Sequence, residues 1–495
     1  MGRYVFVLLM LLVGCQPQQA EQGLLRMGLA QMPVTLDPRY ATDAASLRVQ
    51  ALLHRGLLKL DDGFQLQADL AVSWQHETPL LWRFKLKPDI HFSDGSRLTA
   101  ADVVATFSAV MNKAMASPLR AGFAAIDRLV SEGEDIIVIH LSRPDGSLPT
   151  RLNLGILPSA LAMAPQQARS TIGCGLFKLS RWDNGSLTLA RVKEQGSVAK
   201  IRFSSVKDPV TRVLKLTRGE LDFLQNDLPP QLLPYLAKQA QLTMQTGPST
   251  TFSYLGLNLH DERLKKLAVR RALALALDRH TLKKALFSDL PVLAETVLTP
   301  SHWAATQLPE TAFDLSQAAL LLDHAGLKKN AHGIRFSLNY RTSTDPARLK
   351  LATAIAAMWR QLGVDVKVES LEWGGFYSRI KRGDFQVFSL AWVGINDPDI
   401  YRWILHSSMQ PPNGSNRGRY ANAEMDTWLD QAAASSSLLE RQRLYRKIEK
   451  KMHDEVVYIP LWYDPVIAIS GPRVRGFVVH PDGSLLGLAD VQLQR

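Results

Sequence analysis

Two segments of the chain, residues 201–224 and 334–368, carry the same succession of local signals. Each begins with an apolar strand pattern, continues with an Asp-Pro pair that opens a helix, and ends with a glycine and a second strand pattern. Asp and Pro are favoured where helices start, and glycine where they stop. This order predicts a βαβ unit with parallel strands and a right-handed crossover. Because about 130 residues separate the two units, we expect them in separate lobes of an α/β protein.

Length and composition agree with a folded protein of more than one lobe. A length of 495 residues exceeds what one hydrophobic core usually supports. Hydrophobic residues make up 46% and charged residues 21%, which excludes a disordered or fibrous chain. The two cysteines, Cys15 and Cys174, are too few for a disulfide framework or a Cys-rich zinc site. Cys174 lies in an apolar stretch, so we expect a buried, unreactive thiol.

The formal net charge of +12 favours contact with anionic surfaces. Its distribution argues against a nucleic acid partner, because basic residues are spread along the chain and alternate with acids. The densest basic group, residues 441–451, falls in a helical pattern with Leu444, Tyr445, Ile448 and Met452 on one face. We expect the charged side chains on the other face to be solvated.

The first fifteen residues read as an export signal. Arg3 precedes an apolar run over residues 4–13 that is too short to span a bilayer but fits the core of a signal peptide. The run ends in Leu12-Val13-Gly14-Cys15, the pattern of a bacterial lipobox, in which the Cys is acylated and becomes the new N-terminus. The alternative is an ordinary signal peptide that ends near a Cys. We expect a signal peptide over 1–14, a lipid-anchored tether over 15–23 and an extracytoplasmic or periplasmic body.

Further local signals fit an α/β body. Asn184-Gly185 separates two strand patterns and predicts a two-residue hairpin turn. Thr99 and Asp102 are spaced as the capping pair of a helix.

A dozen short motifs then follow one another over nearly the whole chain. They include His91-Phe92-Ser93-Asp94-Gly95, Gly173-Cys174-Gly175-Leu176-Phe177, Leu277-Asp278-Arg279, Asp397-Pro398, Arg419-Tyr420-Ala421-Asn422 and Ile459-Pro460-Leu461. In this order and spacing the chain resembles the peptide/nickel/opine group of bacterial solute-binding proteins, family 5, which serves dipeptide and oligopeptide importers.

The resemblance implies the class II fold of periplasmic binding proteins, with two lobes of mixed sheets flanked by helices. It places residues 24–46, 172–250 and 463–495 in the first lobe, 47–171 in an additional subdomain and 251–462 in the second lobe. It also implies a monomeric binding protein without enzymatic activity or cofactor, which delivers its solute to the permease and ATPase subunits of an ABC importer.

Ligand is expected at the carboxyl ends of the strands, where loops converge. Asn226 follows one such strand, and peptide-binding members of the family place a ligand-contacting Asn there. By the same resemblance, Tyr254, Trp373 and Trp392 belong to the aromatic lining of the cleft, where large rings tolerate varied ligands. For all four residues, a role in capping or core packing is the alternative.

One position departs from the family pattern. Peptide binders carry an Asp three residues after the Trp, where it pairs with the ligand's ammonium, but Ile395 stands at this position. An aliphatic side chain cannot bind an ammonium. The nearby Asn396 and Asp397 complete the expected ligand-binding set, although Asp397 could instead order the turn before Pro398.

The ligand therefore stays open. An oligopeptide or dipeptide is expected first, and a nickel complex, haem, an opine or a saccharide is the alternative. A sensing or chaperone-like lipoprotein without a transporter is a further alternative. The sequence carries no HxH, HExxH, GxSxG or P-loop spacing, so neither a metal site nor an enzyme is expected.

Overall fold

The computed structural model describes residues 21–193 and 195–494. The predicted signal peptide, the lipidated Cys15 and most of the predicted tether lie outside the described residues. None of the described helices has the length and apolar character needed to cross a bilayer.

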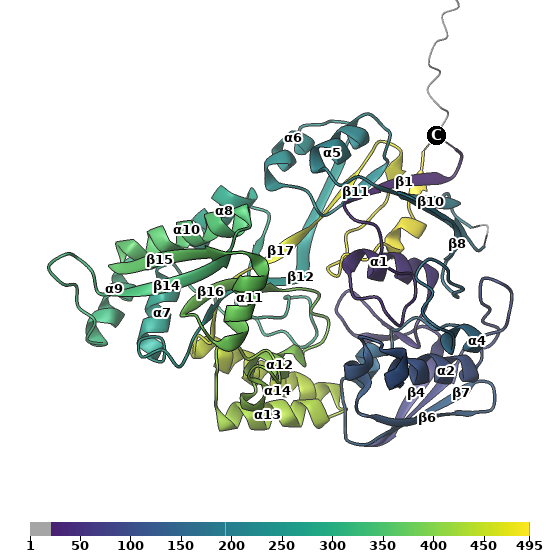
Figure 1. Cartoon of the computed structure of the whole chain (residues 1–495), viewed down its shortest axis with the longest axis horizontal. Helices are drawn as coiled ribbons and strands as arrows, with labels where there is room; N and C mark the ends of the chain where they lie inside the picture. The colour runs from purple at the N-terminus through teal and green to yellow at the C-terminus, as the bar shows by residue number, and fades with distance from the viewer. Residues whose placement is uncertain (1–20, 194, 495) are drawn as a thin grey trace, which may run out of the picture.

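One hydrogen-bonded sheet runs through the molecule and connects two lobes (Figure 1). Its strand order is β15-β14-β16-β12-β17-β11-β1-β10-β9-β8, and β13 pairs with β17. The first lobe holds β1 (Leu24–Leu29), β8 (Phe177–Asp183), β9 (Ser186–Arg191), β10 (Lys200–Ser205) and β11 (Phe223–Gln225). The second lobe holds β13 (Val292–Leu293), β14 (Phe336–Ser343), β15 (Val364–Leu371) and β16 (Val387–Trp392). The predicted two-lobed α/β fold with mixed sheets is confirmed.

Two long antiparallel strands, β12 (Thr243–Leu257) and β17 (Tyr458–Ser470), pass from one lobe to the other. Their pairing is regular up to Pro248 opposite Pro465 and resumes at Phe252 opposite Tyr463. Three residues of β12 therefore face one residue of β17, Asp464, as in a β-bulge. A ladder that loses hydrogen bonds at one level bends there most easily, so we expect any movement between the lobes to occur at this bulge, here called the hinge.

The two βαβ units are present, one in each lobe. In the first, α5 (Pro209–Thr217) connects β10 to β11, which are both parallel to β1 and lie on either side of it. In the second, α10 (Pro346–Gln361) connects β14 directly to its parallel neighbour β15. Asp208 and Asp345 cap the two helices by accepting backbone hydrogen bonds from Thr211 and Arg348. The Asp-Pro signals thus begin helices as predicted.

A separate sheet of order β4-β5-β7-β6 lies in the N-terminal part of the chain, with α2 (Ala100–Met111) packed on β6 and β7. Its strands are β4 (Ala71–Thr78), β5 (Leu81–Leu86), β6 (Ile126–Glu132) and β7 (Ile136–Leu141). Asp102 accepts a hydrogen bond from the Thr99 backbone N–H at 2.8 Å, so the predicted capping pair is confirmed. This sheet has its own hydrophobic core, which includes Phe84, Val103, Phe107 and Ile139.

Shorter elements connect these parts. They are α1 (Ala44–Leu53), β2 (Leu58–Leu60), β3 (Leu66–Ala68), α3 (Leu148–Arg151), α4 (Ser159–Ala162), α6 (Leu233–Ala237), β18 (Val474–Arg475) and β19 (Gln492–Leu493). The turn between β8 and β9 is the predicted Asn184-Gly185 hairpin, with Asp183 paired to Ser186.

Helices cover both faces of the second lobe's sheet. One core contains α7 (Leu267–Leu275), α8 (Arg279–Phe287), α9 (Leu315–His324) and α10. The other contains α11 (Trp373–Arg382), α12 (Ile400–Leu405), α13 (Ala423–Ala434) and α14 (Leu438–Asp454). Strand alternation divides the residues between them: Leu255 and Leu257 of β12 face the first core, whereas Phe252 and Tyr254 face the second.

The expectation that the charged face of the helix over 441–451 is solvated is wrong at two positions. Arg441 and Glu449 of α14 are 4% and 1% exposed. Arg441 donates hydrogen bonds to Gly146 O and Ser147 Oγ, and Glu449 accepts one from the Tyr401 hydroxyl. Helical periodicity identified the apolar face correctly, but it does not show which charged side chains another element covers.

Candidate functional site

Five aromatic side chains of the second lobe form two stacked groups, here called together the aromatic stack. Trp373 and Tyr377 of α11 stack with ring centroids 5.7 Å apart. Trp392, the last residue of β16, lies parallel to Tyr254 of β12 at 6.1 Å, and Tyr254 stacks on Tyr458 of β17 at 4.3 Å. Exposure in the stack ranges from Trp373, which is 49% exposed, to Tyr254, which is fully buried.

The backbone positions this stack beside the hinge. Trp392 pairs in register with Phe252, the first residue of β12 that pairs again after the bulge. The N–H of Ile395, in the loop that follows β16, donates to the carbonyl of Thr250 inside the bulge at 3.1 Å. Trp392, the half-buried end of the group with Tyr254 and Tyr458, therefore lies where the chain passes between the lobes.

Arg417 joins the two parts of the stack. Its guanidinium carbon lies 4.5 Å from the ring centroid of Trp392 and 5.5 Å from that of Tyr377. Its two terminal nitrogens donate to the hydroxyls of Tyr254 and Tyr377, each at 3.1 Å. Burial raises the pKa of Tyr254 to about 12, so its phenol stays protonated at neutral pH.

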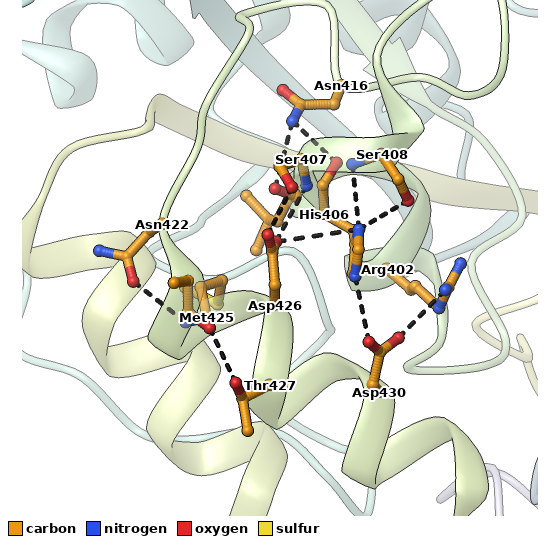
Figure 2. A network of polar contacts seen from close by, with 12 residues as sticks. Arg402, His406, Ser407, Ser408, Asn416, Asn422, Met425, Asp426, Thr427 and Asp430 are labelled. Atoms are coloured by element: carbon orange, nitrogen blue, oxygen red, sulfur yellow. Dashed lines mark hydrogen bonds and ion pairs between the residues drawn. The ribbon is translucent and has the colours of Figure 1, made fainter.

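A polar network holds the loop that carries Arg417 (Figure 2). The Asn416 side-chain amide donates to three carbonyls, those of Leu405, His406 and Tyr420, and its oxygen accepts from Tyr420 N–H. Asn416 is buried, so these bonds fix the backbone immediately before Arg417.

The start of the same loop is tied to α13 (Figure 2). His406 accepts from Ser408 N–H on Nδ1, which leaves Nε2 to donate toward Asp430 at 3.4 Å. Arg402 donates to the other oxygen of Asp430, and the Ser407 N–H donates to Asp426. With both ends fixed, the loop presents Arg417 to the stack in one orientation.

The middle of the segment that follows Trp392 points away from the aromatic stack. Ile395 is buried in the core formed with α11 to α14, which explains an aliphatic residue at this position. Asn396 is half-buried, and its side-chain oxygen has no hydrogen-bond partner among the described residues.

Asp397 contacts the N-terminal part of the chain. Its two oxygens accept hydrogen bonds from Ser147 Oγ at 3.0 Å and Thr150 Oγ1 at 2.6 Å, and one also accepts from Asp399 N–H. Arg441 lies 3.6 Å away. We call this group, Ser147, Thr150, Asp397 and Arg441, the bridging cluster, because it joins α3 to the second lobe.

Asn226 lies in the first lobe and makes its bonds there. It adopts φ 57°, a left-handed conformation that Asn tolerates better than most residues, and exchanges hydrogen bonds with the backbone of Ile467. Its backbone N–H donates one of these bonds, and its side-chain oxygen accepts the other. The side-chain amide nitrogen has no partner among the described residues.

The structure thus brings together three of the six predicted ligand-binding residues, Tyr254, Trp373 and Trp392. Asn226, Asn396 and Asp397 lie outside the aromatic stack, and ligand contact by any of the six stays a prediction. Sequence reasoning missed Arg417, Tyr377 and Tyr458. A basic residue two positions before the motif at residues 419–422 was the available signal for Arg417.

A comparison with protein-family models identifies the family. Residues 65–411 match the model of bacterial extracellular solute-binding proteins, family 5. The chain belongs to this family. The resemblance drawn from sequence motifs is therefore confirmed, and membership makes the chain a binding protein rather than an enzyme.

Similar proteins cover almost the whole chain. The oligopeptide-binding protein AppA of Bacillus subtilis is 25% identical, over 96% of this chain and 92% of its own. The nickel-binding periplasmic protein of Escherichia coli is 26% identical, over 87% of each chain. The solved ABC transporter substrate binding protein CtaP of Listeria monocytogenes superposes with a TM-score of 0.84 at 22% identity, over 96% of this chain and all of its own.

Proposed function

We propose that this family 5 protein is the lipid-anchored, extracytoplasmic receptor of an ABC importer and captures an oligopeptide or dipeptide between its lobes. The observation that carries the proposal is the aromatic stack beside the hinge. Large rings supply contact area without demanding one side-chain chemistry, which suits a receptor for peptides of varied sequence. The similarity to a protein named for oligopeptide binding supports the same class of ligand.

The proposed mechanism is closure about the β12–β17 bulge. A ligand that contacts both lobes favours the closed form by its difference in affinity for the two forms. In this proposal residues 24–46, 172–250 and 463–495 form the first lobe, 47–171 the additional subdomain and 251–462 the second lobe. The proposed boundaries at 250 and 462 coincide with the interrupted pairing of β12 and β17.

Native mass spectrometry of the freshly purified protein tests the ligand class, because a co-purified peptide adds its mass to the folded protein. Small-angle scattering with and without that peptide tests closure. We expect a peptide-containing complex and a smaller radius of gyration on binding. A protein whose dimensions do not change with a bound ligand would contradict the mechanism.

Anchoring and delivery are separate parts of the proposal. The substitution Cys15→Ala is expected to abolish incorporation of labelled palmitate and to release the protein from the membrane fraction. Deletion of the gene is expected to abolish uptake of the captured peptide. Normal uptake after deletion would favour the alternative of a sensing or chaperone-like lipoprotein without a transporter.

A non-peptide ligand is the second candidate, and Ile395 is the observation that favours it. The position at which peptide-binding relatives hold an ammonium is aliphatic and buried here. Native mass spectrometry separates the two candidates, because a nickel complex, haem, an opine or a saccharide differs in mass from a peptide.

A further inference from the structure

Arg417 is a buried cation without an acidic partner. Its side chain is 7% exposed, and among residues 21–193 and 195–494 no carboxylate oxygen lies within 4.0 Å of its guanidinium nitrogens. Its acceptors are two neutral phenols. Arg39 and Arg279, which are also buried, pair with Asp37 and Glu295. Arg212 and Arg270 likewise lack a carboxylate within 4.0 Å among the described residues, but they donate to backbone carbonyls, which Arg417 does not.

Burial of a charge is costly unless the charge is compensated. The ring faces of Trp392 and Tyr377 and the two phenol oxygens compensate part of the Arg417 charge. The remaining positive charge lies next to the half-buried Trp392, beside the bulge between β12 and β17.

The loop beside this cation contains no compensating acid either. Ile395 is packed in the core, and Asp397 is engaged by Ser147 and Thr150. Beside the aromatic stack the described residues therefore place a cation with no carboxylate within 4.0 Å, the opposite of a site built for an ammonium.

We propose that Arg417 binds an anionic group of the ligand, a carboxylate, beside Trp392. The inference rests on the proposed function and specifies its ligand: a peptide would enter this part of the cleft with its carboxylate end. A guanidinium offers parallel N–H donors that match the two oxygens of a carboxylate. The stacked rings exclude water and strengthen that bond.

Two pairs of probes test the inference. The first is a tripeptide mixture with free C-termini and the same mixture with C-terminal amides, measured by native mass spectrometry. The second is benzoate and benzamide, which share a flat apolar body and differ in charge, measured by thermal shift and by saturation-transfer NMR. The small probes report on the cation whether or not peptides are the ligand.

Arg417→Met is the test variant. It replaces a cation that has no acid partner by an apolar side chain of similar length, so the variant protein should fold. Arg419→Met is the matched control from the same loop, since Arg419 donates instead to the carbonyl of Arg382. Thermal unfolding without ligand measures any structural effect of either change.

We expect wild type to bind benzoate, and free-acid tripeptides, about 10- to 100-fold more tightly than the uncharged forms. Arg417→Met should remove this preference and Arg419→Met should keep it. Equal binding of benzoate and benzamide to wild type, or a preference that survives Arg417→Met, would overturn the inference. Binding of both tripeptide mixtures with equal affinity would overturn it and leave the peptide receptor standing. Preference for benzoate without any tripeptide binding would support the anion site and refute the peptide receptor.

Discussion

The carboxylate of Asp397 accepts a hydrogen bond from the hydroxyl of Ser147, which precedes it by 250 residues. Arg441 donates to the same hydroxyl at 2.6 Å, so Ser147 lies between a cation and an anion. Gly146 packs so closely that a Cβ there would lie 2.0 Å from the carbonyl oxygen of Ser435. The bridging cluster is thus a close, polar contact between α3 and the second lobe.

We expect Asp397→Ala to lower the free energy of unfolding by about 2 kcal/mol, because it leaves the buried Ser147 hydroxyl without its acceptor and removes one of the two carboxylates near Arg441. Ser147→Ala and the double variant complete a cycle, measured by urea unfolding. The two positions should couple by about 1 kcal/mol. Strictly additive changes would show that the hydrogen bond contributes nothing to stability.

Glu449 should make stability depend on pH. Burial raises its pKa to about 8, although Tyr401 and Thr306 donate hydrogen bonds to it. Between about pH 4.5 and 8 the unfolded chain has lost this proton while the folded chain keeps it, so stability falls as pH rises. This loss amounts to at most about 1.4 kcal/mol in the free energy of unfolding per pH unit. Glu449→Gln should remove it.

The measurement is the difference between the urea unfolding curves of wild type and Glu449→Gln at pH 5, 6.5 and 8. Burial lowers the pKa of both His54 and His302 to about 4, which makes stability rise with pH up to about 6.5. That contribution is common to both proteins and cancels in the difference. Glu440→Gln, at an exposed position of the same helix, is the control. A difference that stays constant with pH would contradict the raised pKa.

Cys174 should be unreactive in the folded protein. Its side chain is buried, and burial raises the pKa of its thiol to about 11, so about one molecule in a thousand carries the thiolate at pH 8. In a Cys15→Ser background we expect a chromogenic disulfide reagent to label this thiol only after guanidinium is added. Rapid labelling of the native protein would show that residues 172–177 open readily.

The fold was predictable because its signals are local. The Asp-Pro helix starts, the Asn184-Gly185 turn and the Thr99–Asp102 capping pair each depend on neighbours within a few residues. The position of β1 between β10 and β11 was not predictable from these signals, because the crossover rule gives handedness and not the number of strands passed over.

The candidate site was predictable only in part. Aromatic residues at family positions indicated Tyr254, Trp373 and Trp392. The partners of Asp397 and Arg417 lie far away along the chain, and no local pattern gives such pairings. Whether an Asp meets a ligand or a Ser hydroxyl is decided by tertiary packing.

Asn226 allows a capping role and ligand contact to be separated. In Asn226→Gly the residue still adopts φ 57° without strain and loses only the hydrogen bond to Ile467 N–H, so the free energy of unfolding should fall by about 1 kcal/mol. Asn226→Ala should cost about 1–2 kcal/mol more, because a Cβ disfavours this conformation. If the free amide nitrogen contacts the ligand, as predicted from the family resemblance, both variants should weaken binding of the co-purified solute about 5- to 10-fold. Titration calorimetry on both variants measures this affinity, and unfolding in urea measures the stability. Unchanged affinity together with the predicted loss of stability would assign Asn226 to the β11–β17 junction alone.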